Sequence, residues 1–232
     1  MIQSNARRFW LRITVLACTA GIFYSSWPLG YFLNPNVARR GLASALEALN
    51  QPYNWLFIAL DVSSSLLILL MCWLIWRHYK TDGHRQFLGI VILNIIVFSI
   101  GTIIDTLLPE HCLPGAINCP SWRQDHILLV HGVFSILAAF ALFLALVFIW
   151  WRNRNLLLNS LVVGYLVFGL LSLYEALTPT QGNFSQHYYI TLCGVWIALT
   201  PYGIHRALLV QEPAESGKKS ISSSSGGRKP LG

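Results

Sequence analysis

Acidic and histidine side chains that interrupt long apolar runs are the residues of this sequence best placed to do chemistry. Asp61 lies well inside one run, Asp105 lies near the end of the next, and His131 lies inside a third. His126 and His187 stand at the starts of two runs. Ionisable groups within membrane segments are energetically costly, so those that occur usually serve a function. We therefore expect these five side chains to surround one polar cavity.

Two kinds of chemistry fit this set of side chains. Imidazole nitrogens and carboxylates bind zinc, and a zinc ion with an open coordination position activates water for hydrolysis. In this hypothesis the zinc ligands are His126, His131 and His187. The catalytic residues are then Asp61, Ser64 and Asp105, with Ser64 in the cavity wall. Without a metal, Asp61 and His131 could instead share a proton during transport or form a structural pair.

Six apolar runs must position these residues. Each is long enough to cross about 30 Å of hydrocarbon as a helix, and strands at that depth would leave backbone groups unpaired. Hydrophobic residues make up 55% of the chain and charged residues only 11%, against about 25% in soluble domains. The sequence thus predicts an all-α integral membrane protein, an antiparallel bundle of six transmembrane helices. The predicted spans cover residues 10–33, 55–76, 87–108, 127–150, 156–177 and 188–209.

Basic residues set the predicted orientation of this bundle. With the N-terminus in the cytoplasm, every Lys and Arg lies in a cytoplasmic segment except Arg39, Arg40 and Arg123. This bias follows the positive-inside rule, and an even number of spans then places both termini in the cytoplasm. Residues 1–210 form one membrane domain, and residues 211–232 form a disordered, basic, Ser/Gly-rich cytoplasmic tail.

The formal net charge of +7 does not indicate a nucleic-acid partner. The basic residues sit in short clusters between apolar runs, where they fit lipid headgroups better than a nucleic-acid backbone. The predicted partner is therefore the lipid bilayer, and the predicted location is a bacterial plasma membrane.

Two segments outside the spans carry further predictions. Cys112 and Cys119 share the loop after the third span, and a disulfide is expected there if the loop faces an oxidising compartment. The alternative is two unpaired thiols. Residues 36–50 form a short amphipathic pattern, which predicts a helix lying on the outer membrane surface. The apolar positions near one face of that helix are Val37, Leu42, Leu46 and Leu49.

The stretch from Ile104 to Phe140, IDTLLPEHCLPGAINCPSWRQDHILLVHGVFSILAAF, resembles a widespread family of small bacterial membrane proteins of unknown function. The WPLGYFLNP segment at the end of the first span is similar in character. That family looks distantly similar to the alkaline ceramidase and progestin/adipoQ-receptor superfamily of metal-dependent membrane hydrolases.

The resemblance to that superfamily implies a zinc ion held by three histidines, with an Asp and a Ser nearby. The counterparts are Asp61 or Asp105, one of Ser63, Ser64 and Ser65, and the histidines His126, His131 and His187. The chain departs from the pattern by having six apparent spans where the superfamily has seven. It also lacks the superfamily's His-x-x-x-His spacing in the last span.

Two classes of function follow from these observations. The first is a zinc-dependent membrane hydrolase acting on an amide or ester of a lipid-like substrate that enters from the outer leaflet. The second is a non-enzymatic membrane protein, either a small-solute or proton-coupled carrier or a scaffold of a membrane complex. A carrier predicts polar residues that continue through the membrane midplane. The sequence offers Asn94, Ser99 and Asn159 for that role.

Overall fold

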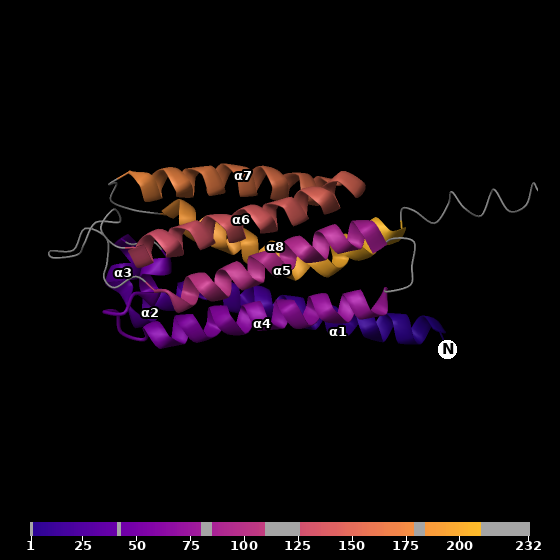
Figure 1. The fold of residues 1–232 in the computed structure, drawn as a ribbon, viewed down its shortest axis with the longest axis horizontal. Helices are drawn as coiled ribbons and strands as arrows, with labels where there is room; N and C mark the ends of the chain where they lie inside the picture. Colours follow the sequence, from indigo (N-terminus) through magenta and orange to yellow (C-terminus); the bar gives the residue numbers. More distant parts are fainter. Residues whose placement is uncertain (1, 41–42, 80–84, 110–125, 179–183, 210–232) are drawn as a thin grey trace, which may run out of the picture.

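The structure, a computed structural model, describes residues 2–40, 43–79, 85–109, 126–178 and 184–209. Within these ranges the chain forms helices and turns and no strand, which confirms the predicted all-α class. The long helices lie side by side along one axis (Figure 1). They are α1 (Ile2–Tyr24), α4 (Asn54–His78), α5 (Arg85–Leu107), α6 (His126–Arg152), α7 (Leu156–Leu177) and α8 (Phe184–Leu209).

Length and hydropathy qualify four of the described helices as membrane spans, in α4, α5, α6 and α7. A fifth span is formed if α1 is joined to the short helices that follow it, η1 (Trp27–Leu29) and α2 (Gly30–Leu33), across a bend of 41°. The structure therefore supports four to five candidate spans, and the predicted count of six is not confirmed. The orientation of the termini likewise stays a prediction.

Helix α8 matches the last predicted span in position, but it is too polar to qualify as one. It packs against α1, α7 and α6. Its polar residues His187 and Thr200 are buried against these neighbours, as are the small residues Cys193 and Gly194. Polar groups inside a membrane bundle normally face other helices and not lipid. The low hydropathy of α8 therefore reflects its place between neighbouring helices.

The helices follow one another around the bundle in the order α1, α4, α5, α6, α7 and α8, and α8 returns to α1. The pair α5 and α6 has the most extensive contact, whereas α6 and α7 contact each other sparingly. Helix α7 is the candidate span with the smallest buried share. Lipid-facing surface is therefore greatest around α7.

Glycines bring α1 and α8 into close contact. A Cβ atom added at Gly21 would meet the carbonyl of Gly194, and one added at Gly194 would meet the carbonyl of Gly21 at 2.6 Å and the hydroxyl of Ser25. Small residues of this kind let helix backbones approach closely in membranes, where packing replaces the hydrophobic effect between helices. This contact fixes the middle of α8 against the last turn of α1.

Residues 30–47 form a cap over the end of the bundle opposite the N-terminus (Figure 1). The cap consists of α2, α3 (Pro35–Arg40) and the 3₁₀ helix η2 (Ala43–Glu47). Val37, Ala38, Ala45 and Leu46 pack with Phe57 of α4 into a small separate core. The prediction of one helix lying on the membrane surface is wrong, because this segment breaks into two short helices that bury their apolar side chains against the bundle.

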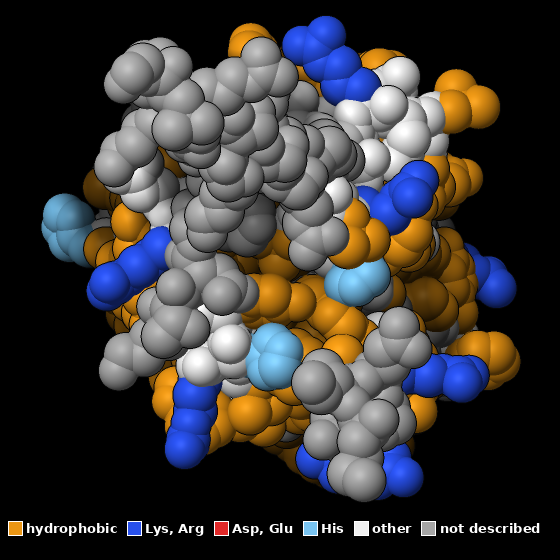
Figure 2. All heavy atoms as spheres, turned by 90° about the vertical axis from the view of Figure 1, so that its right-hand side faces the viewer, with side chains coloured by type: hydrophobic (Ala, Val, Ile, Leu, Met, Phe, Trp, Pro, Cys, Tyr) orange, Lys and Arg blue, Asp and Glu red, His pale blue; other side chains and the backbone are white. Residues whose placement is uncertain are grey.

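Charge is divided between the two ends of the bundle. The acidic residues of the described chain lie in the capped half: Glu47, Asp61, Asp105 and Glu175. The opposite end holds the first turns of α1 and the last turn of α8, and Figure 2 shows Lys and Arg side chains around its rim and no acidic side chain among its coloured residues. The described arginines at that end are Arg7, Arg8, Arg12, Arg77, Arg85, Arg152, Arg154 and Arg206.

Candidate functional site

The carboxylate of Asp105 is the centre of a polar cluster between α5 and α6. Its Oδ1 lies 2.9 Å from Nδ1 of His131 and accepts a hydrogen bond of 2.7 Å from the hydroxyl of Ser135. His131 and Ser135 are four residues apart on α6, so both side chains lie on one helix face. The helix pair with the most extensive contact in the bundle therefore brings these three side chains together.

The two oxygens around His131 define which ring nitrogen carries a proton. Its Nδ1 lies 2.9 Å from the Asp105 carboxylate and 3.1 Å from the Asp105 carbonyl oxygen. Both neighbours accept hydrogen bonds, so Nδ1 is the donor. The His131 side chain is 7% exposed and that of Asp105 is 19% exposed. A change in protonation here would change the charge of a shielded pair.

A second pair of carboxyl groups adjoins the first cluster. Asp61 of α4 lies near Glu47 of η2 and near Asp105, close enough for both to act on it electrostatically. Glu47 is buried, with 7% of its surface exposed. The cap and α4 therefore add two carboxyl groups close to the Asp105–His131 pair.

The sequence analysis did not identify Glu47 as a site residue. It lies in the cap, separated from Asp61 along the chain, and becomes a neighbour of Asp61 only because residues 30–47 fold back over the bundle end. The one available signal was a lone acidic residue among the apolar residues of LASALEAL. That pattern is equally common on exposed amphipathic helices.

An apolar groove of about 360 Å³ lies next to this polar cluster. The helices that line the groove also carry residues of the cluster. Ile58 and Ile127 each lie within one helical turn before a cluster residue, Asp61 and His131 respectively, and Thr106 directly follows Asp105. Leu49 closes the groove two residues after Glu47. Its volume falls in the range of small-molecule pockets. In the described part of the chain, the groove lining contains no titratable side chain, and its residues neighbour those of the cluster along the same elements.

Buried hydroxyl groups continue the polar region toward the middle of the bundle. Tyr189 of α8 donates a hydrogen bond of 2.6 Å to the hydroxyl of Tyr165, which in turn donates one of 2.7 Å to the carbonyl of Ala139. Tyr24 of α1 packs against Phe98 of α5, with 5.3 Å between the ring centroids. The hydrogen-bonded hydroxyl groups of Tyr165 and Tyr189 therefore join α7 to α8.

The residues expected to line a path through the midplane have other partners. Asn94 and Ser99 bond carbonyl oxygens of their own helix, those of Ile90 and Ile95. Asn159 accepts a hydrogen bond from the indole of Trp150. Nearer the middle of the bundle the hydrogen-bonded polar groups are instead the hydroxyls of Tyr165 and Tyr189, which sequence reasoning missed because tyrosine is also common as an interfacial residue.

The structure places the remaining predicted site residues apart from this cluster. Ser64 is fully buried and donates its hydroxyl to the carbonyl of Ala20 in α1 at 2.8 Å. His187 stacks against Trp27 with a distance of 4.4 Å between ring centroids. His126 is the first residue of α6 and is exposed to solvent.

These positions bear directly on the predicted zinc site. In the part of the chain that the structure describes, no group of three or more His, Cys, Asp or Glu side chains is arranged to hold a metal ion. His131 faces Asp105 and His187 faces an aromatic ring, so the three histidines do not form a common ligand set. The donor set in the described ranges does not fit zinc.

Two predictions fall outside the described ranges. Cys112 and Cys119 lie in residues 110–125, and the proposed tail begins after residue 209. The disulfide and the disordered tail therefore stay predictions.

Comparison with known proteins gives a family and no closer relative. A family model described as "Protein of unknown function (DUF998)" matches residues 17–211. No curated protein and no solved structure matches the chain. The family match covers all the helices that build the polar cluster.

Proposed function

The chain belongs to the family described as Protein of unknown function (DUF998), and from its cluster of carboxylates and histidine we propose that it is a proton-coupled carrier of a small amphipathic solute. The protein is a multi-pass membrane protein. In the proposal, the cluster of Glu47, Asp61, Asp105 and His131 binds and releases protons as the solute enters or leaves the adjoining groove.

The observation that carries the proposal is the gathering of ionisable side chains in a shielded part of the bundle. Asp61 lies near Glu47 and Asp105, and the Asp105 carboxylate faces His131 at 2.9 Å. In the proposal, release of protons by this cluster makes its charge more negative in a region of low dielectric constant. Such a change strongly alters which solute and which helix arrangement are favoured.

The buried tyrosines support a carrier more than a static scaffold. Tyr165 and Tyr189 place a hydrogen-bonded pair of hydroxyl groups between α7 and α8. Carriers require polar groups that continue toward the midplane, whereas a scaffold does not.

The lining of the groove supports a solute with an apolar part. Its side chains are mostly aliphatic, from Leu49, Ile58, Leu107, Leu108 and Ile127. A polar or charged part of the solute would then reach the titratable cluster. By the positive-inside rule the groove would open on the outer side of the membrane.

The hydrolase alternative receives less support from the serine contacts. A nucleophilic serine needs a base that takes its proton. Ser64 donates its hydroxyl to a backbone carbonyl, and Ser135 donates to the Asp105 carboxylate, which already interacts with His131. Neither contact prepares an attack on a substrate.

Proton binding by the purified chain tests the first half of the proposal. The full-length protein in lipid nanodiscs should take up protons when the pH is lowered, and infrared difference spectra should show carboxyl and imidazole bands. Asp105→Asn and His131→Gln should each remove part of this uptake. Glu175→Gln is the matched control, because Glu175 lies in the same half of the bundle but accepts hydrogen bonds from the backbone N–H and the hydroxyl of Ser185 in α8.

Transport by proteoliposomes tests the second half. Liposomes containing the protein and a pH-sensitive dye are exposed to a panel of small amphipathic amines and acids. At least one solute should drive proton movement that is lost in Asp105→Asn and kept in Glu175→Gln. Proton movement equal to that of empty liposomes across the panel would exclude a proton-coupled carrier of this class. Unchanged uptake in both cluster variants would show that the cluster is structural.

A further inference from the structure

Three buried hydrogen-bond donors without a partner lie in the turn between α6 and α7, at the basic end of the bundle. They are Nη1 of Arg152, Nδ2 of Asn153 and Nδ2 of Asn155. Each atom is shielded from solvent and has no acceptor among the described residues. A buried donor left without a partner is destabilising, and more so when it is charged. Three such donors within four residues indicate that an acceptor outside the described residues completes this turn.

The local structure fixes where these donors point. The guanidinium of Arg152 lies over the ring of Phe87 in α5, 4.5 Å from its centroid. The side-chain oxygen of Asn155 accepts the backbone N–H of Leu158 at 2.9 Å and caps the start of α7. The amide nitrogen of Asn155 therefore cannot turn back toward that backbone.

The charges around the turn show what kind of acceptor is missing. All three unpartnered atoms are N–H donors, and one of them belongs to a cation. The described acidic residues lie in the other half of the bundle, so none of them can neutralise Arg152. The first turn of α7 adds its own partial positive charge at the same place. The missing acceptor is therefore an anion with several oxygens.

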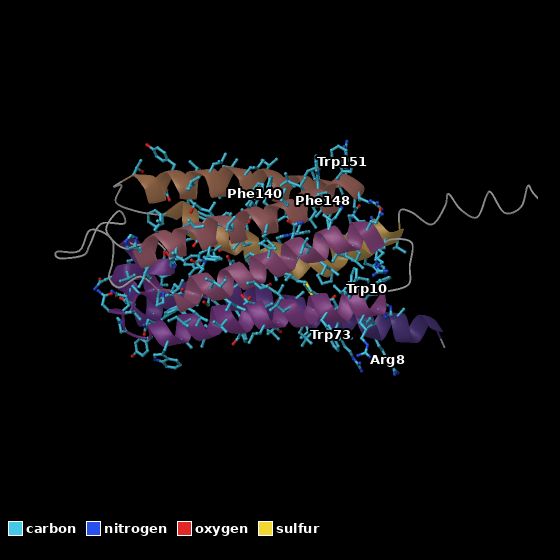
Figure 3. All side chains as sticks on the ribbon, in the orientation of Figure 1. Arg8, Trp10, Trp73, Phe140, Phe148 and Trp151 are labelled. Carbon is cyan, nitrogen blue, oxygen red and sulfur yellow. The ribbon has the colours of Figure 1, made fainter. Side chains whose placement is uncertain are left out.

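From these observations we propose that the turn Arg152–Asn155 binds the phosphate of an anionic lipid headgroup. The turn joins two candidate spans and so lies at the level of the headgroups. Trp151 is 67% exposed beside it, and Figure 3 shows that ring pointing outward from the bundle. Leu156 at the start of α7 is 82% exposed. Exposed aromatic and aliphatic side chains beside basic residues are typical of the lipid interface.

Arg154 adds a second positive charge to this lipid-facing surface. Its guanidinium lies 5.3 Å from the ring centroids of both Trp150 and Trp151. Stacking on two rings keeps this charge beside the turn. A soluble anion would be bound by Arg152 and the two asparagines alone, whereas an anionic lipid would also place its acyl chains against α7.

Lipid retention by the full-length protein tests the proposal. The protein is purified in mild detergent with equal amounts of phosphatidylglycerol and phosphatidylcholine, and bound lipid is counted by native mass spectrometry. The wild type should retain phosphatidylglycerol selectively. Arg152→Met should weaken this binding by about tenfold or more, because hydrogen bonds to charged groups are worth about 1.5–3 kcal/mol and 1.4 kcal/mol is a factor of ten.

Arg77→Met is the matched control for Arg152→Met. Arg77 ends α4 at the same end of the bundle, and its guanidinium also lies over an aromatic ring, that of Trp73 at 5.4 Å. Both variants lose the same charge, so only Arg152→Met should lose the bound lipid. Equal retention in the two variants, or equal loss, overturns a specific site at the turn. Equal retention of both lipids by the wild type overturns it as well.

Two further experiments distinguish a lipid site from a site for a soluble anion and from a folding defect. Inorganic phosphate added at millimolar concentration should leave the lipid bound, and displacement of the lipid by phosphate alone overturns the lipid assignment in favour of a soluble anion. If Arg152→Met is not monodisperse, Asn153→Ala removes an unpartnered donor without changing charge. Asn153→Ala should also reduce retention of phosphatidylglycerol, and unchanged retention in this folded variant overturns the proposal.

Discussion

Asp105 differs from the other acidic residues of the described chain because its carboxylate meets two partners from one neighbouring helix. His131 and Ser135 reach it from adjacent turns of α6, and the first of them also contacts its backbone carbonyl. A carboxylate in this position has little access to water, so its hydrogen bonds contribute to stability as well as to function. The contribution of Ser135 can be measured separately from proton binding.

Replacing Ser135 with Ala should destabilise the bundle by about 1–2 kcal/mol, since a hydrogen bond to a charged group is lost and the carboxylate is left partly unsatisfied. The measurement is the free energy of unfolding in mixed micelles. Ser160→Ala is the control, because Ser160 is exposed on α7 and bonds the Leu156 carbonyl of its own helix. A loss no greater than that of Ser160→Ala would contradict the role assigned to Ser135.

The adjacent serines Ser64 and Ser65 provide a second test at the residue scale. Both are fully buried in α4, but Ser64 donates to the Ala20 carbonyl of α1, whereas the Ser65 hydroxyl has no partner among the described residues. Ser64→Ala should cost about 0.5–1.5 kcal/mol in the free energy of unfolding. Ser65→Ala should be neutral or stabilising, because it removes a buried hydroxyl that gains nothing.

The comparison of Ser64→Ala with Ser65→Ala also tests the catalytic role once predicted for Ser64. If Ser64 only joins α4 to α1, its loss should reduce stability and leave proton uptake by the cluster unchanged. Equal stability of the two variants, together with altered proton uptake in Ser64→Ala, would return Ser64 to the functional site.

At the scale of helices, the crossing of α1 and α8 is the contact most sensitive to added volume. Gly194→Val should destabilise the bundle by about 1–3 kcal/mol or prevent folding, because its side chain would meet the backbone carbonyl of Gly21 in α1 and the side chain of Ser25 just after α1, and overpacking forces helices apart. Gly132→Val is the control, since a Cβ atom at Gly132 meets nothing within 4 Å.

Thermal unfolding in detergent compares Gly194→Val with its control. Gly132→Val lies on α6 with open space beside it, so the melting temperature should change little. A similar loss in both variants would mean that valine is harmful for its low helix propensity alone. The close crossing would then have no special part in stability.

Hydropathy was enough to predict most of the helices, and α7 begins and ends at the residues predicted for that run. The predicted span over α8 is not confirmed, since the polar residues of α8 lower its hydropathy and a sum over residues does not record which neighbour covers a side chain. Glu47 was missed for a related reason. Its contact with Asp61 depends on the fold of the cap, which no local pattern encodes.

For the whole molecule, the division of charge between the ends determines how it lies in a membrane. The basic end has no acidic residue in the described ranges, and the capped half holds the acidic cluster. If the bundle lay in the opposite orientation, every described arginine of the basic end would face the outside, against the positive-inside rule. The cluster should therefore open on the outer face.

Cysteine accessibility in intact cells tests this orientation, with single cysteines placed on a variant that lacks the native ones. A cysteine at Asn50, exposed beside the cap, should react with an impermeant maleimide added outside. A cysteine at Arg154, exposed in the turn between α6 and α7, should react only after permeabilisation. The two positions lie at opposite ends of the bundle, so each is the control for the other.

The reverse labelling pattern would have a specific consequence for function. It would place the groove and the Asp105–His131 pair on the cytoplasmic face, so that protons and solute would be taken from the cell interior. It would also place the Arg152–Asn155 turn in the outer leaflet, whereas anionic lipids are concentrated in the cytoplasmic leaflet. The helices α4, α5 and α6 lie between Asn50 and Arg154. If each of them crosses the membrane once, the two positions face opposite sides, so labelling of both from outside would be incompatible with this bundle. The topology measurement therefore decides the direction in which a proton-coupled cycle could run, before any solute is identified.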